Sequence, residues 1–247
     1  MNKKFFALPV QKQEAILNAG FCVFSQNSYK KSPTSEIADA AGISKSLLFH
    51  YFYNKRELYL FLWEKCAQIT MEALEKSGCY EQTDLFDSMN LGLQAKLEIM
   101  RRYPHMGTFV MKAYYEKDPD VRPAIQESIA KYADFKTNTV LLNLNPEHFI
   151  EGLDLEMMYL DMLWASEGYI WEKLQHDHIN VDEIEADFIK LIDFWKSIYL
   201  RTERELYECD PTIKSNQILR KIQGNLKFKP GCKRRGILWL YRSKRRR

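Results

Sequence analysis

Residues 34–52, TSEIADAAGISKSLLFHYF, restrict the fold more than any other segment of this 247-residue chain. Two short apolar stretches flank one glycine, Gly42, which can adopt the left-handed backbone conformation that ends a helix at little cost. Thr34 and Ser44 precede the two stretches, and each can cap a helix by accepting backbone N–H bonds. The side chains expected to face inward are Ile37, Ala38, Ala41, Leu47 or Leu48, and Phe52. The segment therefore predicts two short helices joined by a tight turn.

Helical periodicity continues on both sides of this segment. Apolar residues recur mostly at three- and four-residue steps from Val10 to Phe24, and Asn54 can cap a long helix from Lys55 to about Lys76. Further helices are expected near 84–102, 104–116, 119–143, 147–176 with a break near Gly152, and 181–207. Ten glycines and eight prolines are few for a strand-and-turn architecture. These observations predict an all-α protein.

Charge divides the chain into three blocks. Residues 1–57 carry a net charge of +4, residues 58–210 carry −14 and residues 211–247 carry +13, although the whole chain has only +3. A basic beginning suits contact with nucleic acid, whereas an acidic body does not. We therefore expect an N-terminal three-helix domain over 1–54, a larger helical domain over 55–210, and a basic tail of uncertain status over 211–247.

Two short helices around a glycine turn form a helix-turn-helix, in which the first helix braces the second against DNA. The major groove is about 12 Å wide, which matches the diameter of a helix with its side chains. Small residues are needed where the helices cross, and Ala38, Ala41 and Gly42 supply them. Polar tips are expected on the outer face of the second helix, at Lys45, Ser46, His50 and Tyr51. This arrangement predicts double-stranded DNA as a partner.

The same residues resemble the DNA-binding domain of the tetracycline-repressor (TetR) family of transcriptional regulators. The resemblance covers about residues 10–60 in motif detail, and turn, caps and the trailing K-x-x-L agree in order and spacing. The matching positions are Thr34, Ile37-Ala38, Ala41-Gly42-Ile43-Ser44, Leu48-Phe49, Tyr51-Phe52 and Lys55-Arg56-Glu57-Leu58-Tyr59. The remaining chain fits the family only in length and helical class.

The resemblance implies roles for individual side chains of the helix-turn-helix. Thr34 and Lys55 match positions that bind DNA phosphates, whereas Phe49 matches a position that lies against the DNA backbone. The family usually has tyrosine there, and Phe49 lacks the hydroxyl that could donate to a phosphate. Lys45, Ser46 and Leu47 match positions that face base edges, and Tyr51 matches a second aromatic position at the backbone. The full set of expected DNA-binding residues is Thr34, Ser44, Lys45, Ser46, Leu47, Phe49, His50, Tyr51 and Lys55.

One helix-turn-helix buries too little surface for tight specific binding, so such proteins usually form dimers that read two half-sites. The resemblance implies that the last two long helices pair with those of a second copy. The candidate interface residues are Leu160, Trp171, Leu174, Phe188, Ile192, Trp195 and Tyr199. The alternative is that these helices only close the core of one subunit.

The resemblance further implies that the acidic body binds a small-molecule effector, whose entry moves the two DNA-binding domains out of register. An apolar or aromatic effector is expected, and the whole protein is expected to be a homodimeric repressor released from a palindromic operator. The candidate lining residues are Met106, Phe109, Met111, Tyr114, Met157, Trp164 and Tyr169. Each of these could instead be an ordinary core residue.

Nothing in the sequence supports catalysis, a cofactor or a metal site. The chain lacks H-E-x-x-H, G-x-S-x-G, G-x-G-x-x-G and Walker-type motifs, so we expect no enzyme. His176 and His178 are two residues apart, a spacing that does not place both imidazoles on one helical face. Five scattered cysteines, no long apolar run and no secretory signal favour a cytoplasmic protein that does not enter a membrane.

The basic tail and the competing functional classes stay open at this point. The tail could be an arm that attracts phosphates, an appended or read-through segment, or, through Gly236–Tyr241, a segment that binds a membrane surface or another chain. One competing function is a partner-binding regulator that acts through the acidic body. The other is an enzyme or small-molecule binding protein that merely retains a helix-turn-helix. The sequence does not distinguish a repressor from an activator.

Overall fold

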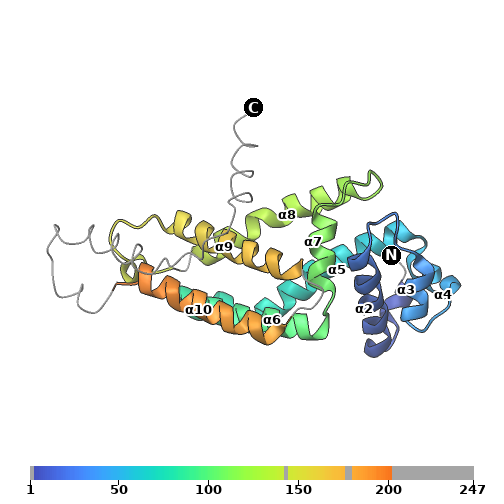
Figure 1. The fold of residues 1–247 in the computed structure, drawn as a ribbon, viewed down its shortest axis with the longest axis horizontal. Coiled ribbons are helices and arrows are strands. Elements are labelled where there is room, and N and C mark those ends of the chain that lie inside the picture. Colours follow the sequence, from blue (N-terminus) through green and yellow to red (C-terminus); the bar gives the residue numbers. More distant parts are fainter. Residues whose placement is uncertain (1–2, 142–143, 176–179, 202–247) are drawn as a thin grey trace, which may run out of the picture. The chain divides into compact units, whose positions relative to one another are not determined.

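The structure is a computed structural model that describes residues 3–141, 144–175 and 180–201, with the backbone alone over 132–141. The chain through Leu200 forms one compact unit. Its α-helices are α1 (Lys3–Phe6), α2 (Val10–Gln26), α3 (Thr34–Ala40), α4 (Lys45–Phe52), α5 (Lys55–Lys76), α6 (Leu85–Arg102), α7 (Met106–Tyr114), α8 (Arg122–Leu141), α9 (Leu155–Leu174) and α10 (Val181–Tyr199) (Figure 1). Two short 3₁₀ helices lie at Cys79–Glu81 and Pro146–His148. The described residues contain no strand, which confirms the all-α prediction.

The turn between α3 and α4 has the predicted chemistry. Gly42 has φ +66°. The N–H of Gly42 donates to the carbonyl of Asp39, and the N–H of Ile43 donates to the carbonyl of Ala38, both at 3.0 Å. These two bonds satisfy the last carbonyls of α3 in the pattern of a Schellman motif. Ser44 then caps α4, because its Oγ accepts the N–H of Leu47 at 3.2 Å.

Two predicted details of the helix ends need correction. Thr34 is the first residue of α3 rather than its cap, and Pro33 holds the cap position without a side-chain bond. α10 ends at Tyr199 instead of continuing, because Leu200 is extended and forms an antiparallel bridge with Phe149. The predicted break near Gly152 is confirmed, since Gly152 has φ +77° and α9 begins after it.

The helices α1 to α4, which we call the reading head, pack around the first half of α5 (Figure 1). α2 approaches α5 very closely at Gly20, where an added Cβ would lie 2.6 Å from Cδ1 of Leu62. Leu58 and Leu62 of α5 are fully buried in this contact. The absence of a side chain at Gly20 therefore sets the spacing between α2 and the helix that leads into the rest of the protein.

A first hydrophobic core joins the reading head to α7. Phe109 of α7 is fully buried, and its ring centroid lies 5.5 Å from that of Phe21, 6.1 Å from that of Phe24 and 5.3 Å from that of Tyr59. The predicted boundary between residues 54 and 55 thus crosses a continuous core instead of a linker. The division into domains stays a prediction from the sequence.

A second core lies between α6, α9 and α10. Its fully or almost fully buried residues include Phe86, Leu97, Met158, Met162, Ile184, Ile192 and Trp195. None of the described helices is long and apolar enough to cross a membrane. The unit therefore contains two hydrophobic cores. α7 contributes to the first core and also contacts α9, a helix of the second core.

Replacing Gly42 tests the turn. Gly42→Ala is expected to lower the free energy of unfolding by about 1 kcal/mol, because an L side chain at positive φ is strained even though the space around Gly42 is open. Gly42→Asn should cost less, since asparagine tolerates this conformation. Urea denaturation of both variants measures the difference, and equal costs for alanine and asparagine would contradict the backbone explanation.

Candidate nucleic-acid interface

The outer face of α4 is exposed and its inner face is buried. Leu48 is fully buried and Phe52 is almost fully buried, whereas Leu47 is 36% exposed. The structure thus decides between Leu47 and Leu48, which the sequence left open. The exposed residues of this face include four of the predicted DNA-binding residues, Lys45, Ser46, Leu47 and His50, and the cap residue Ser44 is exposed beside them.

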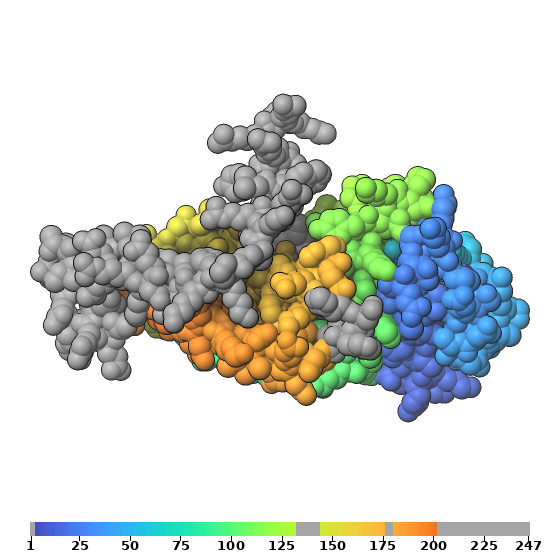
Figure 2. Space-filling view, viewed as in Figure 1, coloured from blue at the N-terminus to red at the C-terminus, as the bar shows by residue number. Residues whose placement is uncertain are grey.

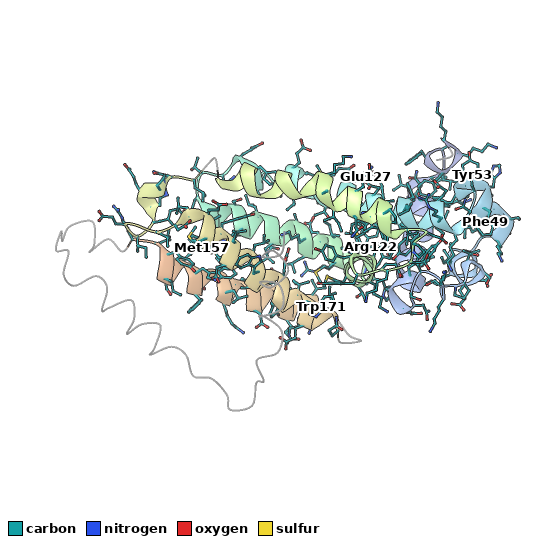
Figure 3. All side chains as sticks on the ribbon, turned by 90° about the horizontal axis from the view of Figure 1, so that it is seen from above. Phe49, Tyr53, Arg122, Glu127, Met157 and Trp171 are labelled. Atoms are coloured by element: carbon teal, nitrogen blue, oxygen red, sulfur yellow. The ribbon has the colours of Figure 1, made fainter. Side chains whose placement is uncertain are left out.

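Local contacts order the exposed side chains of α4. The ammonium of Lys45 lies 6.0 Å from the ring centroid of Phe49, a half-buried residue at the outer end of the reading head (Figure 3). The hydroxyls of Ser44 and Ser46 are 3.0 Å apart. The Nζ of Lys4 donates to Nε2 of His50 at 3.0 Å, so this nitrogen acts as an acceptor. The face therefore combines a cation, hydroxyls, an imidazole and an apolar tip, and α4 contains no acidic residue.

Tyr51 does not lie on the outer face as predicted. It is only 8% exposed, and its ring centroid lies 6.4 Å from that of Phe5. Phe5 belongs to α1, a four-residue helix that our sequence analysis did not predict, and it is fully buried. The adjacent Phe5 and Phe6 were the available signal, since phenylalanine is among the residues most often fully buried. Tyr51 therefore packs inside the reading head, where its ring helps to hold α1 against α4.

Lys55 is engaged within the protein. Its Nζ donates to the backbone carbonyl of Lys30 at 2.9 Å and lies 5.1 Å from the ring centroid of Tyr29. Burial lowers the pKa of Lys55 below its usual range, while Asp118 acts in the opposite direction. Thr34, the other predicted phosphate contact, is 9% exposed. Their roles at phosphates stay predictions, and the more exposed Lys30 is a basic residue that our sequence analysis overlooked.

The seven predicted effector contacts do not surround one space. Met106 and Phe109 belong to the first core, and Tyr169 borders the second core, where its hydroxyl donates to Asp187 at 2.8 Å. Met111 is half-buried. The remaining three are 44–50% exposed, and they are Tyr114, Met157 and Trp164. The assignment of these residues to an effector site therefore stays a prediction.

A half-open pocket of about 310 Å³ lies elsewhere, beside the end of α4 and one face of α5. Its lining residues are Tyr51, Phe52, Tyr53, Glu57, Leu60, Phe61, Glu64, Lys65 and Gln68. None of the predicted effector contacts takes part in it. Tyr53 is exposed at the edge of this pocket (Figure 3). Its backbone has φ +62°, a conformation that residues other than glycine rarely adopt.

The predicted dimer residues divide into buried and accessible groups. Leu174, Ile192 and Trp195 are buried, whereas Trp171 is 39% exposed. Leu160, Phe188 and Tyr199 are half-buried. The exposed large apolar side chains of α9 are Met157, Trp164 and Trp171, seven residues apart, and those of α10 are Ile189 and Phe194. Figure 3 labels Met157 and Trp171 near the two ends of α9. The accessible stripe of α9 was thus predicted only in part.

The described residues contain no group of three or more His, Cys, Asp and Glu side chains arranged to hold a metal ion. His176 and His178 lie outside the described residues, as does the predicted basic tail. The described geometry, a capped eight-residue helix braced by α3 with its outer face exposed, defines a helix-turn-helix protein.

Comparison with known proteins agrees with this class. Residues 16–61 match the family model described as bacterial regulatory proteins, tetR family. The HTH-type transcriptional regulator RutR of Escherichia coli strain K12 is 26% identical over 163 residues, which cover 63% of this chain and 71% of RutR. The structure of a TetR family transcriptional regulator from Chloroflexus aurantiacus superposes with a TM-score of 0.52 at 20% identity, over 81% of this chain and 99% of that one. FadR from Bacillus halodurans, a fatty acid degradation regulator, gives a TM-score of 0.54 at 16% identity, over 74% of this chain and 95% of FadR.

The chain is thus similar to TetR family transcriptional regulators, in its DNA-binding segment over residues 16–61 and in its helical fold. It is therefore a DNA-binding regulator, and the similar proteins are named as regulators rather than enzymes. The resemblance inferred from residues 34–59 is confirmed.

Substitution of Lys45, the exposed lysine of α4, tests whether it contacts the edges of DNA bases. Lys45→Ala is expected to reduce the preference for the operator over random DNA by roughly tenfold, because one good base contact discriminates by about 1–3 kcal/mol. Lys55→Ala should weaken binding to all sequences and reduce the salt slope by about one unit if it also reaches a phosphate. Fluorescence anisotropy at several salt concentrations measures both quantities, and equal behaviour of the two variants would refute the assigned roles.

Proposed function

We propose that this regulator is a homodimeric repressor that leaves a palindromic operator when an apolar or aromatic small molecule binds its acidic helical body. The observation that carries the DNA-binding part is the exposed outer face of α4, held out by the Gly42 turn and the Ser44 cap. The acidic body over residues 58–210 would repel phosphates, whereas the basic reading head would attract them. We place the protein in the cytoplasm, where its DNA partner is found.

The exposed stripe on α9 supports the dimer. Met157, Trp164 and Trp171 repeat at seven-residue spacing, so they lie along one side of the helix. Gly168 lies on the same side, and an added Cβ there would meet nothing within 4 Å. Large exposed aromatic side chains beside a small residue suit close packing of a second helix. We assign this stripe, together with Ile189 and Phe194 of α10, to the contact with a second copy.

The chemical class of the effector rests on the composition of the body and on relatives. FadR of Bacillus halodurans is titled a fatty acid degradation regulator, and a Bacillus subtilis relative is named a fatty acid metabolism regulator protein. The second core of this chain is rich in methionine and aromatic side chains, which adapt to apolar ligands of different shape. These facts support an apolar effector for this protein as well.

A mobility-shift assay against the DNA that flanks the protein's own gene tests the proposal most directly. We expect binding with sequence preference at moderate salt, and release when the cognate apolar ligand is added from a panel of fatty acids and aromatic compounds. Lack of sequence preference would count against the DNA-binding role. Sequence-preferring binding that persists with every ligand, without any ligand-induced shift in melting temperature, would count against the effector alone.

Interruption of the stripe on α9 tests the dimer. Trp164→Glu should shift the subunits from dimer to monomer at micromolar concentration, because it places a charge in the centre of an apolar contact. Operator affinity should fall as well, since one subunit contacts only one half-site. Tyr53→Glu is the control for the association state alone, because Tyr53 is an exposed ring outside α9 and α10. Sedimentation velocity decides, and identical behaviour of both variants would contradict the assignment.

A further inference from the structure

The loop between α7 and α8, residues 115–121, is attached to the reading head by a carboxylate. Glu116 accepts the backbone N–H of Tyr29 on one oxygen, at 2.8 Å. Its other oxygen accepts the N–H groups of Lys117 at 2.9 Å and Asp118 at 3.1 Å. One side chain thus joins the loop's own backbone to the turn between α2 and α3. Hydrogen bonds from amides to an ionised carboxylate are about twice as strong as neutral ones.

A second carboxylate reaches the same turn. Asp118 is 9% exposed, and its Oδ1 accepts the N–H of Asp120 at 3.0 Å. Its Oδ2 lies 3.2 Å from the ammonium of Lys30. The N–H of Asp120 and the charge of Lys30 hold the pKa of Asp118 below its usual range. The carboxylate is therefore ionised at neutral pH and opposes a lysine of the reading head.

Further bonds complete a polar joint, which we define as Tyr29, Lys30, Lys55 and Arg56 on one side and Glu116, Asp118 and Asp120 on the other. The Nε of Arg56 donates to the backbone carbonyl of Asp120 at 2.7 Å. The Nζ of Lys55 donates to the carbonyl of Lys30 at 2.9 Å. The joint consequently fixes the turn after α2, the start of α5 and the loop after α7 to one another.

The polar joint lies next to the helices that hold α4 in place. The turn that contains Tyr29 leads directly into Thr34 and α3, and α3 braces α4. The space-filling view shows the surface of the reading head directly against that of α7 and the loop that follows it (Figure 2). A shift of the loop would therefore move the support on which α4 rests.

α7 and the loop that follows it also contact the last turn of α9. An added Cβ at Gly107 would lie 3.3 Å from Cδ2 of Leu174, and the ring centroids of Tyr115 and Trp171 are 5.2 Å apart. Leu174 and Trp171 both belong to the last turn of α9. α7 and its loop are thus placed between the reading head and α9.

We propose that Glu116 and Asp118 are positioning residues that set the orientation of the reading head from the α7–α8 loop. This inference rests on the proposed function, because an orientation of the head matters only for a protein that reads DNA. The two carboxylates act differently. Glu116 holds the backbone of the α2–α3 turn and thereby the orientation of α4. Asp118 neutralises Lys30 and withholds its ammonium from DNA phosphates.

Three charge-neutralising substitutions in the full chain test the inference. Glu116→Gln and Asp118→Asn remove one charge each with little change in size. Glu127→Gln is the matched control, because Glu127 is an exposed acidic residue on α8 for which no contact to the reading head is found (Figure 3). Each variant is measured for affinity to operator DNA, for affinity to random DNA over a range of salt, and for hydrogen exchange at the amide of Tyr29 without DNA.

For Glu116→Gln we expect the Tyr29 amide to exchange at least tenfold faster, because its charged acceptor is lost. Operator affinity should fall by roughly five- to tenfold while affinity for random DNA changes less than twofold, because phosphate contacts do not depend on the orientation of α4. For Asp118→Asn we expect affinity for random DNA to rise by about threefold and the salt slope to steepen by up to one unit, because Lys30 becomes available. The control should match the wild type in all three measurements.

An unchanged rate at Tyr29 in Glu116→Gln would overturn the inference. So would a parallel loss of operator and random binding together with a lower melting temperature, because that pattern indicates a purely structural contribution. If the wild type shows no sequence preference, the proposed function fails, whereas hydrogen exchange at Tyr29 still decides whether Glu116 holds the turn. The two failures are therefore distinguishable.

Discussion

The left-handed backbone at Gly42 is the constraint on which the DNA-binding surface depends. It allows the last carbonyls of α3 to be satisfied within two residues, and Ser44 starts α4 immediately afterwards. The two helices can then cross with Ala38 buried and Leu48 directed inward. The direction of the exposed side chains of α4 is set by this turn together with the burial of Leu48 and Phe52 on the opposite side of the helix.

Features governed by nearby residues could be predicted from the sequence. The caps Ser44 and Asn54 and the terminator Gly42 act within three residues of their partners, so their positions follow from local patterns. Features governed by distant residues could not be predicted. The burial of Tyr51 depends on Phe5, which lies 46 positions earlier, and the bond from Lys55 to Lys30 spans 25 positions. Helical periodicity shows which side of a helix is apolar, but it does not show what covers that side.

The same limit explains why the sequence did not show which apolar side chains of the acidic body are buried and which are exposed. Apolar side chains on α9 face both inward and outward, so Met158 and Met162 enter the second core while Met157 and Trp164 remain exposed. The expected effector contacts included the exposed Met157 and Trp164 but neither of the buried methionines Met158 and Met162. The aromatic cluster around Phe109 was equally hidden, because it requires α2, α5 and α7 to meet. Through this cluster, α7 belongs to the same hydrophobic core as the reading head, although it is remote from the reading head in sequence.

The separation of charge along the chain has a consequence for the encounter with DNA. A net charge of +4 over residues 1–57 and fourteen excess negative charges over residues 58–210 give this part of the chain an electric dipole. In the field of a polyanion such a molecule turns its positive end forward before any atom touches, so more of its collisions begin in a usable orientation. Added salt shortens the range of that torque to about 8 Å at physiological ionic strength. The distribution of charge therefore governs how quickly a site is found, separately from how firmly it is held.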